Sequence, residues 1–334
     1  MKRLLGGALM VCLGLVAIYA LALVQCSCGL IGPLAAVETV MPYWALQYFL
    51  LVPLALMVLE VPFTGWRNSS LAMILGWSPS IRTDALYLAI QSTAVLPALM
   101  AATTGGLFWH LRQLVDAHTL KLGLVIANPI LQCAVIFVVG DFVSYWVHRW
   151  MHVSPALWEA HKVHHSATDL NLMIAFRFHP LEKTVLELGY MFSFLVLGAT
   201  TDTFVTFSFI NMLLGQIQHA RVDWTYGPVG KVLVSPMFHR FHHSIHRADF
   251  DKNFASRLVI WDMLFGTYSA KRITPQSIGV DDNTYERGSL AAEFFRPYYV
   301  WCLSAVDTCR RAVATAGALA RRRPAKEIVA GPSD

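Results

Sequence analysis

Histidine spacing is the feature of this sequence that most directly suggests chemistry. The chain has 13 histidines, and eleven of them fall between residues 148 and 246. An HxxxH pair is followed by two HxxHH triplets, with members His148, His152, His161, His164, His165, His239, His242 and His243. Side chains three or four residues apart share a helix face, and imidazole is the commonest metal ligand among side chains. The spacing predicts metal-binding helices, in which each triplet can give one ring to one ion and another ring to a neighbouring ion.

The number of these histidines indicates how many ions they could hold. A single ion with open positions needs three or four protein ligands, so eight histidines suit two ions. The HxxHH triplet occurs twice, at His161 and at His239, which is difficult to attribute to chance. Imidazole suits Fe, Zn, Cu and Ni alike, so the spacing leaves the metal open. His110 and His118 lie outside the groups and are interpreted as ordinary hydrogen-bonded residues.

Three further histidines lie between or beside these motifs. His219 directly follows an apolar stretch, so we expect it near the motifs as an additional ligand. His179 lies in the run RFHPLE at residues 177–182, and it fits a ligand and a hydrogen-bonding role around the ligands equally well. His246 is close to the second triplet but outside its spacing, and its role stays open.

Carboxylates near the motifs could orient the imidazole rings. A metal-bound imidazole usually donates its other N–H to a carboxylate or a carbonyl. Asp141, Asp169, Glu182 and Asp262 are placed in the sequence to accept such bonds. Each of them is equally expected to cap a helix or to form an ion pair.

The elements that carry these residues are expected to lie in a membrane. The chain is 56% hydrophobic and 14% charged, whereas about 25% is usual for soluble domains. A spanning helix needs about 20 mostly apolar residues. The candidate spans are residues 4–25, 41–60, 84–104 and 122–140. A further apolar stretch, 185–218, is broken at residues 200–203 and predicts a tight pair of helices or a hairpin that dips into the membrane.

Loop charges predict the orientation of these spans. Lys2 and Arg3 place the N-terminus inside, the loop 26–40 has no Lys or Arg, and Arg67 and Arg82 lie in the next loop. Basic residues favour the cytoplasmic side, so residues 141–183 and 219–334 are expected inside. This orientation places every histidine motif on the cytoplasmic face.

Other features limit the function classes. Six cysteines include no C-x-x-C pair, and there is no Gly-rich nucleotide loop. The net charge of +5 reflects basic residues gathered after residue 218, which is typical of a cytoplasmic membrane face rather than of nucleic-acid binding. Residues 298–320 are expected to form a basic helix on the membrane surface, and the tail beyond Pro324 is expected to be disordered.

The text around the histidines resembles the fatty acid hydroxylase superfamily, in its sterol desaturase-like branch. The similar stretches are DFVSYWVHRWMH (141–152), SPALWEAHKVHHS (154–166), RFHPLE (177–182), SPMFHRFHHS (235–244) and WDMLFGTY (261–268). Asn253 also fits the pattern. The resemblance covers about residues 130–270, and the stretch after His243 departs from the family's pattern through its extra His246.

The resemblance implies a membrane oxygenase with two iron ions and a mostly histidine ligand set. The ligands carried over by motif are the eight histidines above, with His219 as the additional one. Such an enzyme uses O2 to hydroxylate or desaturate a fatty acyl, sterol or related lipid. The sequence contains no fused haem, flavin or iron–sulfur motif, so a separate cytochrome b5-like or ferredoxin-type electron donor is implied.

Three other classes are weighed against this reading. A metal transporter would place ionisable groups inside its spanning helices, and the cores of the expected first, third and fourth spans have none. A membrane haem protein would need histidine pairs within apolar helices, whereas these lie in polar segments. A zinc-dependent membrane hydrolase could share the ligands, but it would need neither O2 nor reductant.

We therefore expect an all-α fold, a polytopic membrane helical bundle with a cytosolic histidine-rich helical cap that holds a dinuclear metal site. Residues 1–121 would form N-terminal transmembrane helices, and residues 122–270 would form the catalytic domain. Residues 271–334 would form the basic surface helix and the tail.

Overall fold

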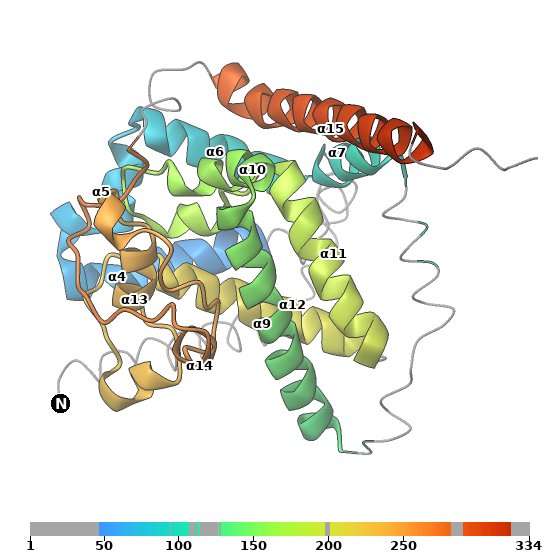
Figure 1. The fold of residues 1–334 in the computed structure, drawn as a ribbon. Helices are drawn as coiled ribbons and strands as arrows, with labels where there is room; N and C mark the ends of the chain where they lie inside the picture. The colour runs from blue at the N-terminus through green and yellow to red at the C-terminus, as the bar shows by residue number, and fades with distance from the viewer. Residues whose placement is uncertain are drawn as a thin grey trace, which may run out of the picture.

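A computed structural model describes residues 47–93, 95–106, 128–197, 201–281 and 290–321, with the single residues 110, 113 and 126. The described part contains helices and no named strand, apart from isolated bridges between Leu233 and Leu258 and between Ser244 and Ile278. The expected all-α fold is thus confirmed for these residues (Figure 1). The elements are η1 Gln47–Leu51, α4 Val52–Thr64, η2 Trp66–Asn68, α5 Ser70–Leu75, α6 Pro79–Gln91, α7 Val95–Thr104, α9 Pro129–Val153, α10 Pro155–His165, η4 Leu172–Phe176, α11 Pro180–Leu197, α12 Thr201–Gln218, η5 Gly227–Lys231, α13 Pro236–His242, η6 Arg247–Asp249, α14 Ile260–Leu264 and α15 Leu290–Arg321.

Local sequence signals define the helices that carry the histidine motifs. Asn128 begins α9, because its side-chain oxygen accepts from the backbone N–H of Ile130 at 2.9 Å. Ser235 caps α13 in the same way, through the N–H of Phe238 at 3.2 Å. Proline follows each cap as the first helical residue, where its missing N–H costs nothing. Pro155 similarly starts α10 directly after α9 ends, so the chain turns between the first two motifs.

One described helix is long and apolar enough to cross a membrane. It covers Ile130–Val153 within α9, with a mean hydropathy of 1.8. The span expected at 122–140 therefore starts later and continues through His148 and His152. The span expected at 84–104 is replaced by two helices, α6 and α7, that meet at 80°.

The remaining expected spans have different outcomes. Residues 49–64 form a shorter apolar helix in place of 41–60. The stretch 185–218 is a pair of helices, α11 and α12, separated near residue 200, where polar threonines follow one another. The span at 4–25 lies outside the described residues, as do His118 and the tail beyond residue 321.

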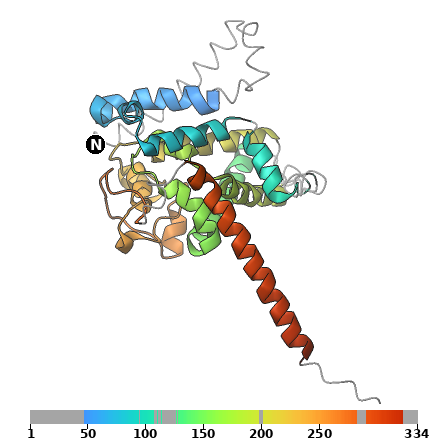
Figure 2. The same ribbon diagram turned by 90° about the horizontal axis from the view of Figure 1, so that it is seen from above.

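The long helices α9, α11 and α12 pack against the two helices that carry the HxxHH triplets, α10 and α13. Figure 1 shows α9, α11 and α12 extending together from the region of α10 and α13. The helix expected at 298–320 is the C-terminal part of α15, and it starts earlier, at Leu290. The first turns of α15 lie against α10, where the Trp301 side chain donates to the carbonyl of Ala156 at 2.9 Å. Figure 2 shows that the C-terminal half of α15 projects away from the rest of the molecule.

Candidate metal centre

The structure brings all nine histidines that were expected as ligands into two adjacent groups. The five-histidine group consists of His148, His152, His161, His165 and His242, and the four-histidine group consists of His164, His219, His239 and His243. Within each group the candidate ligand nitrogens lie within 4.8 Å of one another. The rings are buried, except that His152 is partly exposed. Each group is large enough to hold one metal ion.

The HxxHH triplets divide between the two groups in a regular way. In α10, His161 and His165 belong to the five-histidine group, whereas His164 belongs to the other. In α13, His239 and His243 share the four-histidine group, whereas His242 joins the five-histidine group. Successive residues lie about 100° apart around a helix axis. The first and last residues of a triplet are therefore about 40° apart, whereas the middle one is about 60° from the first and about 100° from the last. The first and last rings of a triplet therefore grip one site together, and the middle ring reaches the other.

The facing nitrogens form a set that a cation would complete. The Nε2 atom of His161 lies 3.0 Å from Nε2 of His148 and 3.1 Å from Nε2 of His165. In the four-histidine group, Nε2 of His239 lies 3.0 Å from that of His219. In a neutral ring whose Nδ1 atom carries the proton, the Nε2 atom has a free lone pair. Two such lone pairs on nitrogens about 3 Å apart repel each other. A metal ion between them removes this repulsion, so the donor set fits a metal.

Backbone carbonyls and one carboxylate fix the orientation of four rings. The Nδ1 atom of His148 lies 2.7 Å from the carbonyl oxygen of Phe254, and that of His242 lies 2.8 Å from the carbonyl oxygen of Lys252. His219 similarly donates to Gly215 at 2.7 Å. Such partners select the tautomer and aim the other nitrogen at the metal.

Of the four carboxylates expected from the sequence, Glu182 is the one that hydrogen-bonds to a candidate ligand. Its Oε1 lies 2.6 Å from Nδ1 of His161, and both side chains are almost fully buried. Burial raises the pKa of Glu182 well above its ordinary value, whereas the backbone N–H of His179 and the charge of Lys183 lower it. A nearby cation would favour the anionic form, which accepts the Nδ1 proton of His161.

The rings themselves are held in the neutral form that binds metal. Burial, followed by the neighbouring imidazoles, lowers the pKa of His161, His165 and His239 well below its ordinary value. Burial also lowers the pKa of His219 to about 4. Because these values are far below 7, a metal would displace no ring proton at neutral pH.

The other three carboxylates serve the surrounding loops. Asp141 accepts from the N–H of Leu258 and from the indole of Trp261, both at 2.9 Å. Asp262 accepts from the N–H groups of Phe254 and Ala255 at 2.9 and 2.8 Å, so it orders the carbonyl that holds His148. Asp169 accepts from the hydroxyl of Ser78.

His179 and His246 lie outside both groups. The buried His179 donates from Nε2 to the carbonyl of Phe294 at 2.9 Å, and its Nδ1 accepts from the N–H of Leu181. His179 therefore fastens α15 to the start of α11. His246 is exposed, and its backbone N–H donates to Ser244. His110 is also exposed and belongs to neither group.

Several residues at the site have no signal in histidine spacing. The carbonyls of Phe254 and Lys252 flank Asn253, which has a φ of +59°, a conformation that Asn adopts more readily than most residues. Phe178 stacks on His164 with ring centroids 5.0 Å apart. Trp158, about one turn before the first HxxHH triplet begins, has its ring centroid 5.0 Å from that of His152.

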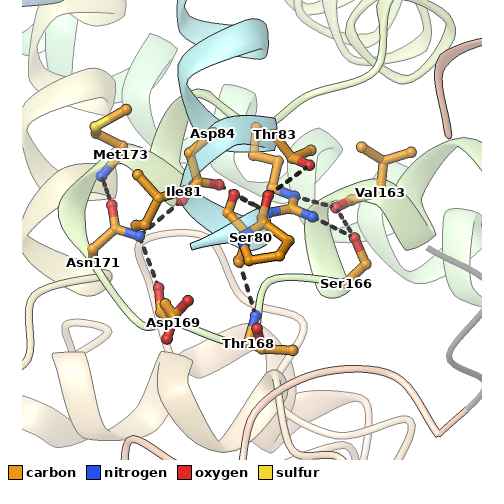
Figure 3. A network of polar contacts seen from close by, with 12 residues as sticks. Ser80, Ile81, Thr83, Asp84, Val163, Ser166, Thr168, Asp169, Asn171 and Met173 are labelled. Carbon is orange, nitrogen blue, oxygen red and sulfur yellow. Dashed lines mark hydrogen bonds and ion pairs between the residues drawn. The ribbon is translucent and has the colours of Figure 1, made fainter. Parts of the chain in front are cut away.

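A buried arginine anchors the end of α10. Arg177 donates from Nε to the carbonyl of Val163 at 2.8 Å and from a terminal nitrogen to the Ser166 hydroxyl at 2.7 Å. It also donates to Asp84 at 3.0 Å, and both side chains are almost fully buried. Figure 3 shows Asp84, Ser80, Val163 and Ser166 gathered around one guanidinium group. Because Val163 and Ser166 bracket His164 and His165, this network sets where α10 ends relative to α6.

A family comparison matches the part of the chain that holds this centre. Residues 133–267 match the model of the fatty acid hydroxylase family. The range contains all nine histidines of the two groups. The resemblance drawn from the motifs is therefore confirmed for this region.

Curated relatives match over a similar region. Alkylglycerol monooxygenase of Homo sapiens is 35% identical over 134 residues, which are 39% of this chain and 29% of that protein. Ornithine lipid hydroxylase OlsE of Rhizobium tropici is 33% identical over 145 residues, 43% of this chain and 44% of that protein. Methylsterol monooxygenase 1-3 of Arabidopsis thaliana is 25% identical over 144 residues, 42% of this chain and 49% of that protein. The chain thus spans less than half the length of these relatives, and no solved structure matches it significantly.

Proposed function

We propose, from the match of residues 133–267 to the fatty acid hydroxylase family, that this protein is a membrane di-iron oxygenase acting on a lipid. The observation that carries the proposal is the pair of adjacent histidine groups, with five and four ligands, among the described residues. All nine members were expected from the sequence. No carboxylate or cysteine of the described part belongs to either group.

The choice of iron comes from the chemistry of the relatives. Imidazole would also bind zinc, but zinc has no redox chemistry. The relatives named above are monooxygenases and a hydroxylase, and such reactions need a redox-active centre, which zinc cannot provide but iron can. Two iron ions, when bound, would supply the activation of O2 and the oxidation of a C–H bond by hydroxylation or desaturation.

The protein's own residues would bind, orient and shield that centre. The buried imidazoles hold the ions without adding negative charge, and Glu182 fixes His161 through the 2.6 Å contact. The surrounding helices exclude water from the ligand nitrogens, because most of the rings are buried. The substrate would be a lipid, since the relatives act on alkylglycerol, ornithine lipid and methylsterol by name.

The remaining parts of the proposal concern the setting of the enzyme. The protein would be a multi-pass membrane protein whose catalytic face is cytoplasmic. Residues 1–121 would anchor it, residues 122–270 would carry out the chemistry, and residues 271–334 would add the basic surface helix and the tail. A cytochrome b5-like or ferredoxin-type protein would supply the electrons.

Lipid analysis under labelled oxygen tests the proposed reaction. Cells with and without the gene would be grown under ¹⁸O2, and their lipid extracts compared by mass spectrometry. We expect one lipid class to gain a labelled oxygen, or a double bond, only when the gene is present. The His164→Ala and His242→Ala variants remove one ligand from each group, and each should abolish this product while the protein stays in the membrane. Full activity in both variants would contradict the ligand assignment.

A further inference from the structure

We infer that the surface formed by residues 246–252, in which Asp249 is buried and most of the others are exposed, together with Lys271 and Arg272, is the docking site for an acidic one-electron donor protein. This inference rests on the proposed function and adds to it the place where electrons enter. The surface is called the 246–252 surface below. Three observations carry it: its distance to the five-histidine group, its charge and its rigidity.

The 246–252 surface is one hydrogen bond away from the five-histidine group. The carbonyl oxygen of Lys252 lies 2.8 Å from Nδ1 of His242. Beside it, a carboxylate oxygen of Asp251 lies 3.9 Å from Nδ1 of His152, and the Asp251 side chain is 71% exposed. A redox centre docked on this loop would therefore be separated from two candidate ligands by a single layer of residues. Electron transfer between proteins favours such a short, bonded route.

Among the residues that the structure describes, no ring of the four-histidine group has a hydrogen bond to residues 246–252. Its His219 donates instead to Gly215, within the apolar helix α12. Its His164 stacks on Phe178, which lies between η4 and α11. The two groups thus have different surroundings, and the five-histidine group is the one with a direct connection to the 246–252 surface.

The charge of the 246–252 surface suits an acidic partner. Residues 246–252 and 271–272 contain four basic side chains, Arg247, Lys252, Lys271 and Arg272, against two acidic ones, Asp249 and Asp251. The Arg247 side chain is 83% exposed and pairs with Asp281, and Lys271 is 64% exposed and pairs with Asp249. When Asp281 is included, the four basic side chains still exceed the three acidic ones by one. An excess of one charge accelerates the approach of an oppositely charged partner. Electron-transfer complexes are typically weak and use small interfaces, so a patch of this size is sufficient.

Local contacts hold this surface in place. Lys271 binds Asp249 at 2.7 Å, and Asp249 in turn accepts from the hydroxyl of Ser244 at 3.1 Å. The N–H of Ser269 donates to the Asn253 side chain at 2.7 Å, which links the two segments. A preformed surface loses little conformational entropy when a partner docks. The segment therefore offers a fixed arrangement of charges close in sequence to Lys252, whose carbonyl contacts His242.

A charge-reversal experiment tests the docking site. The full chain, purified in detergent, would be titrated with the soluble haem domain of an acidic cytochrome b5 and, separately, with an acidic [2Fe–2S] ferredoxin. Binding is measured on both the iron-loaded and the metal-free protein, so that the readout does not depend on turnover. We expect the Lys271→Glu/Arg272→Glu variant to bind at least one donor about tenfold more weakly at low salt. The difference should shrink at high salt, where surface charges are screened.

The matched control is Arg310→Glu/Arg311→Glu, on the projecting part of α15, which changes the net charge by the same amount. Both arginines are exposed, with 80% of the Arg311 side chain accessible, and this variant should leave donor binding unchanged. The inference is overturned if neither donor binds the parent protein, if the double variant binds as the parent does, or if the control weakens binding equally. The iron content of the same samples keeps the two proposals distinct, since a parent that holds iron but binds neither donor loses only the docking site.

Discussion

At the scale of single residues, the second nitrogen of each imidazole determines how well the ring can bind a metal. Four candidate ligands have an identified partner for that nitrogen, and three of the partners are backbone carbonyls, those of Phe254, Lys252 and Gly215. Any residue type supplies a carbonyl, so these partners could not be predicted from the sequence. Glu182 is the exception among the four, and its place beside a histidine motif was the signal that suggested it.

The Glu182→Gln variant should weaken metal binding without unfolding the protein. Glutamine keeps the shape but loses the charge that holds the Nδ1 proton of His161, and loss of such a partner typically costs about 10–100-fold in affinity. Metal affinity would be measured by chelator competition. Glu187→Gln is the control, because Glu187 lies on the same helix and pairs with Lys183 away from the rings. Equal affinities in the two variants would show that Glu182 does not support the centre.

His179 should make the docking of α15 sensitive to acid. Burial lowers the pKa of His179 to about 4 from an ordinary value of 6.5, so the unfolded or undocked chain binds its proton more readily. Above pH 6.5, His179 is neutral in both the docked and the undocked chain and does not oppose docking of α15. As the pH falls from 6.5 toward 4, the undocked chain takes up a proton more readily, so the docked state loses stability. The protection factors of the amides of residues 290–301 against hydrogen exchange, corrected for the pH dependence of the intrinsic exchange rate, should therefore fall over this range. A His179→Gln variant cannot titrate at this position, and an unchanged pH profile in that variant would argue against His179 as the cause.

At the scale of elements, the histidine spacing predicted more than the apolar runs did. Residues on a helix have a fixed angular order, so the HxxHH triplets in α10 and α13 had to present rings in two directions. Apolar runs specify length but not straightness, which is why residues 84–104 became two helices at 80°. The start of α9 at Pro129 depends on a cap at Asn128, a signal that hydrophobicity alone overlooks.

Arg177 connects α10 to α6, and its loss should destabilise that junction. Arg177→Met leaves Asp84 buried without its partner, and breaking a buried pair in this way costs about 3–5 kcal/mol. The free energy of unfolding in detergent and the iron content should both fall. Adding Asp84→Leu removes the isolated charge and should recover most of the stability. The metal content should recover less, because the carbonyl of Val163 and the hydroxyl of Ser166 still lack their donor.

At the scale of the whole molecule, the structure combines two adjacent histidine groups with at least one described helix, α9, that is long and apolar enough to cross a bilayer. The family match, at residues 133–267, coincides with that combination. The sequence could predict that this region contains metal ligands and an apolar helix, because the spacing of histidines and the length of apolar runs can be read directly from the sequence. It could not predict that α15 reaches back over α10, since the contacts of Phe294 and Trp301 join segments more than 100 residues apart.

The metal content of the purified protein tests the central claim most directly. Iron and zinc would be quantified by mass spectrometry in the detergent-purified parent and in the His164→Ala and His242→Ala variants. We predict about two irons per chain in the parent, one for each histidine group, and less iron in each variant. One zinc or more per chain, with little iron and no iron-dependent oxidation of lipid, would contradict the account and favour a zinc hydrolase.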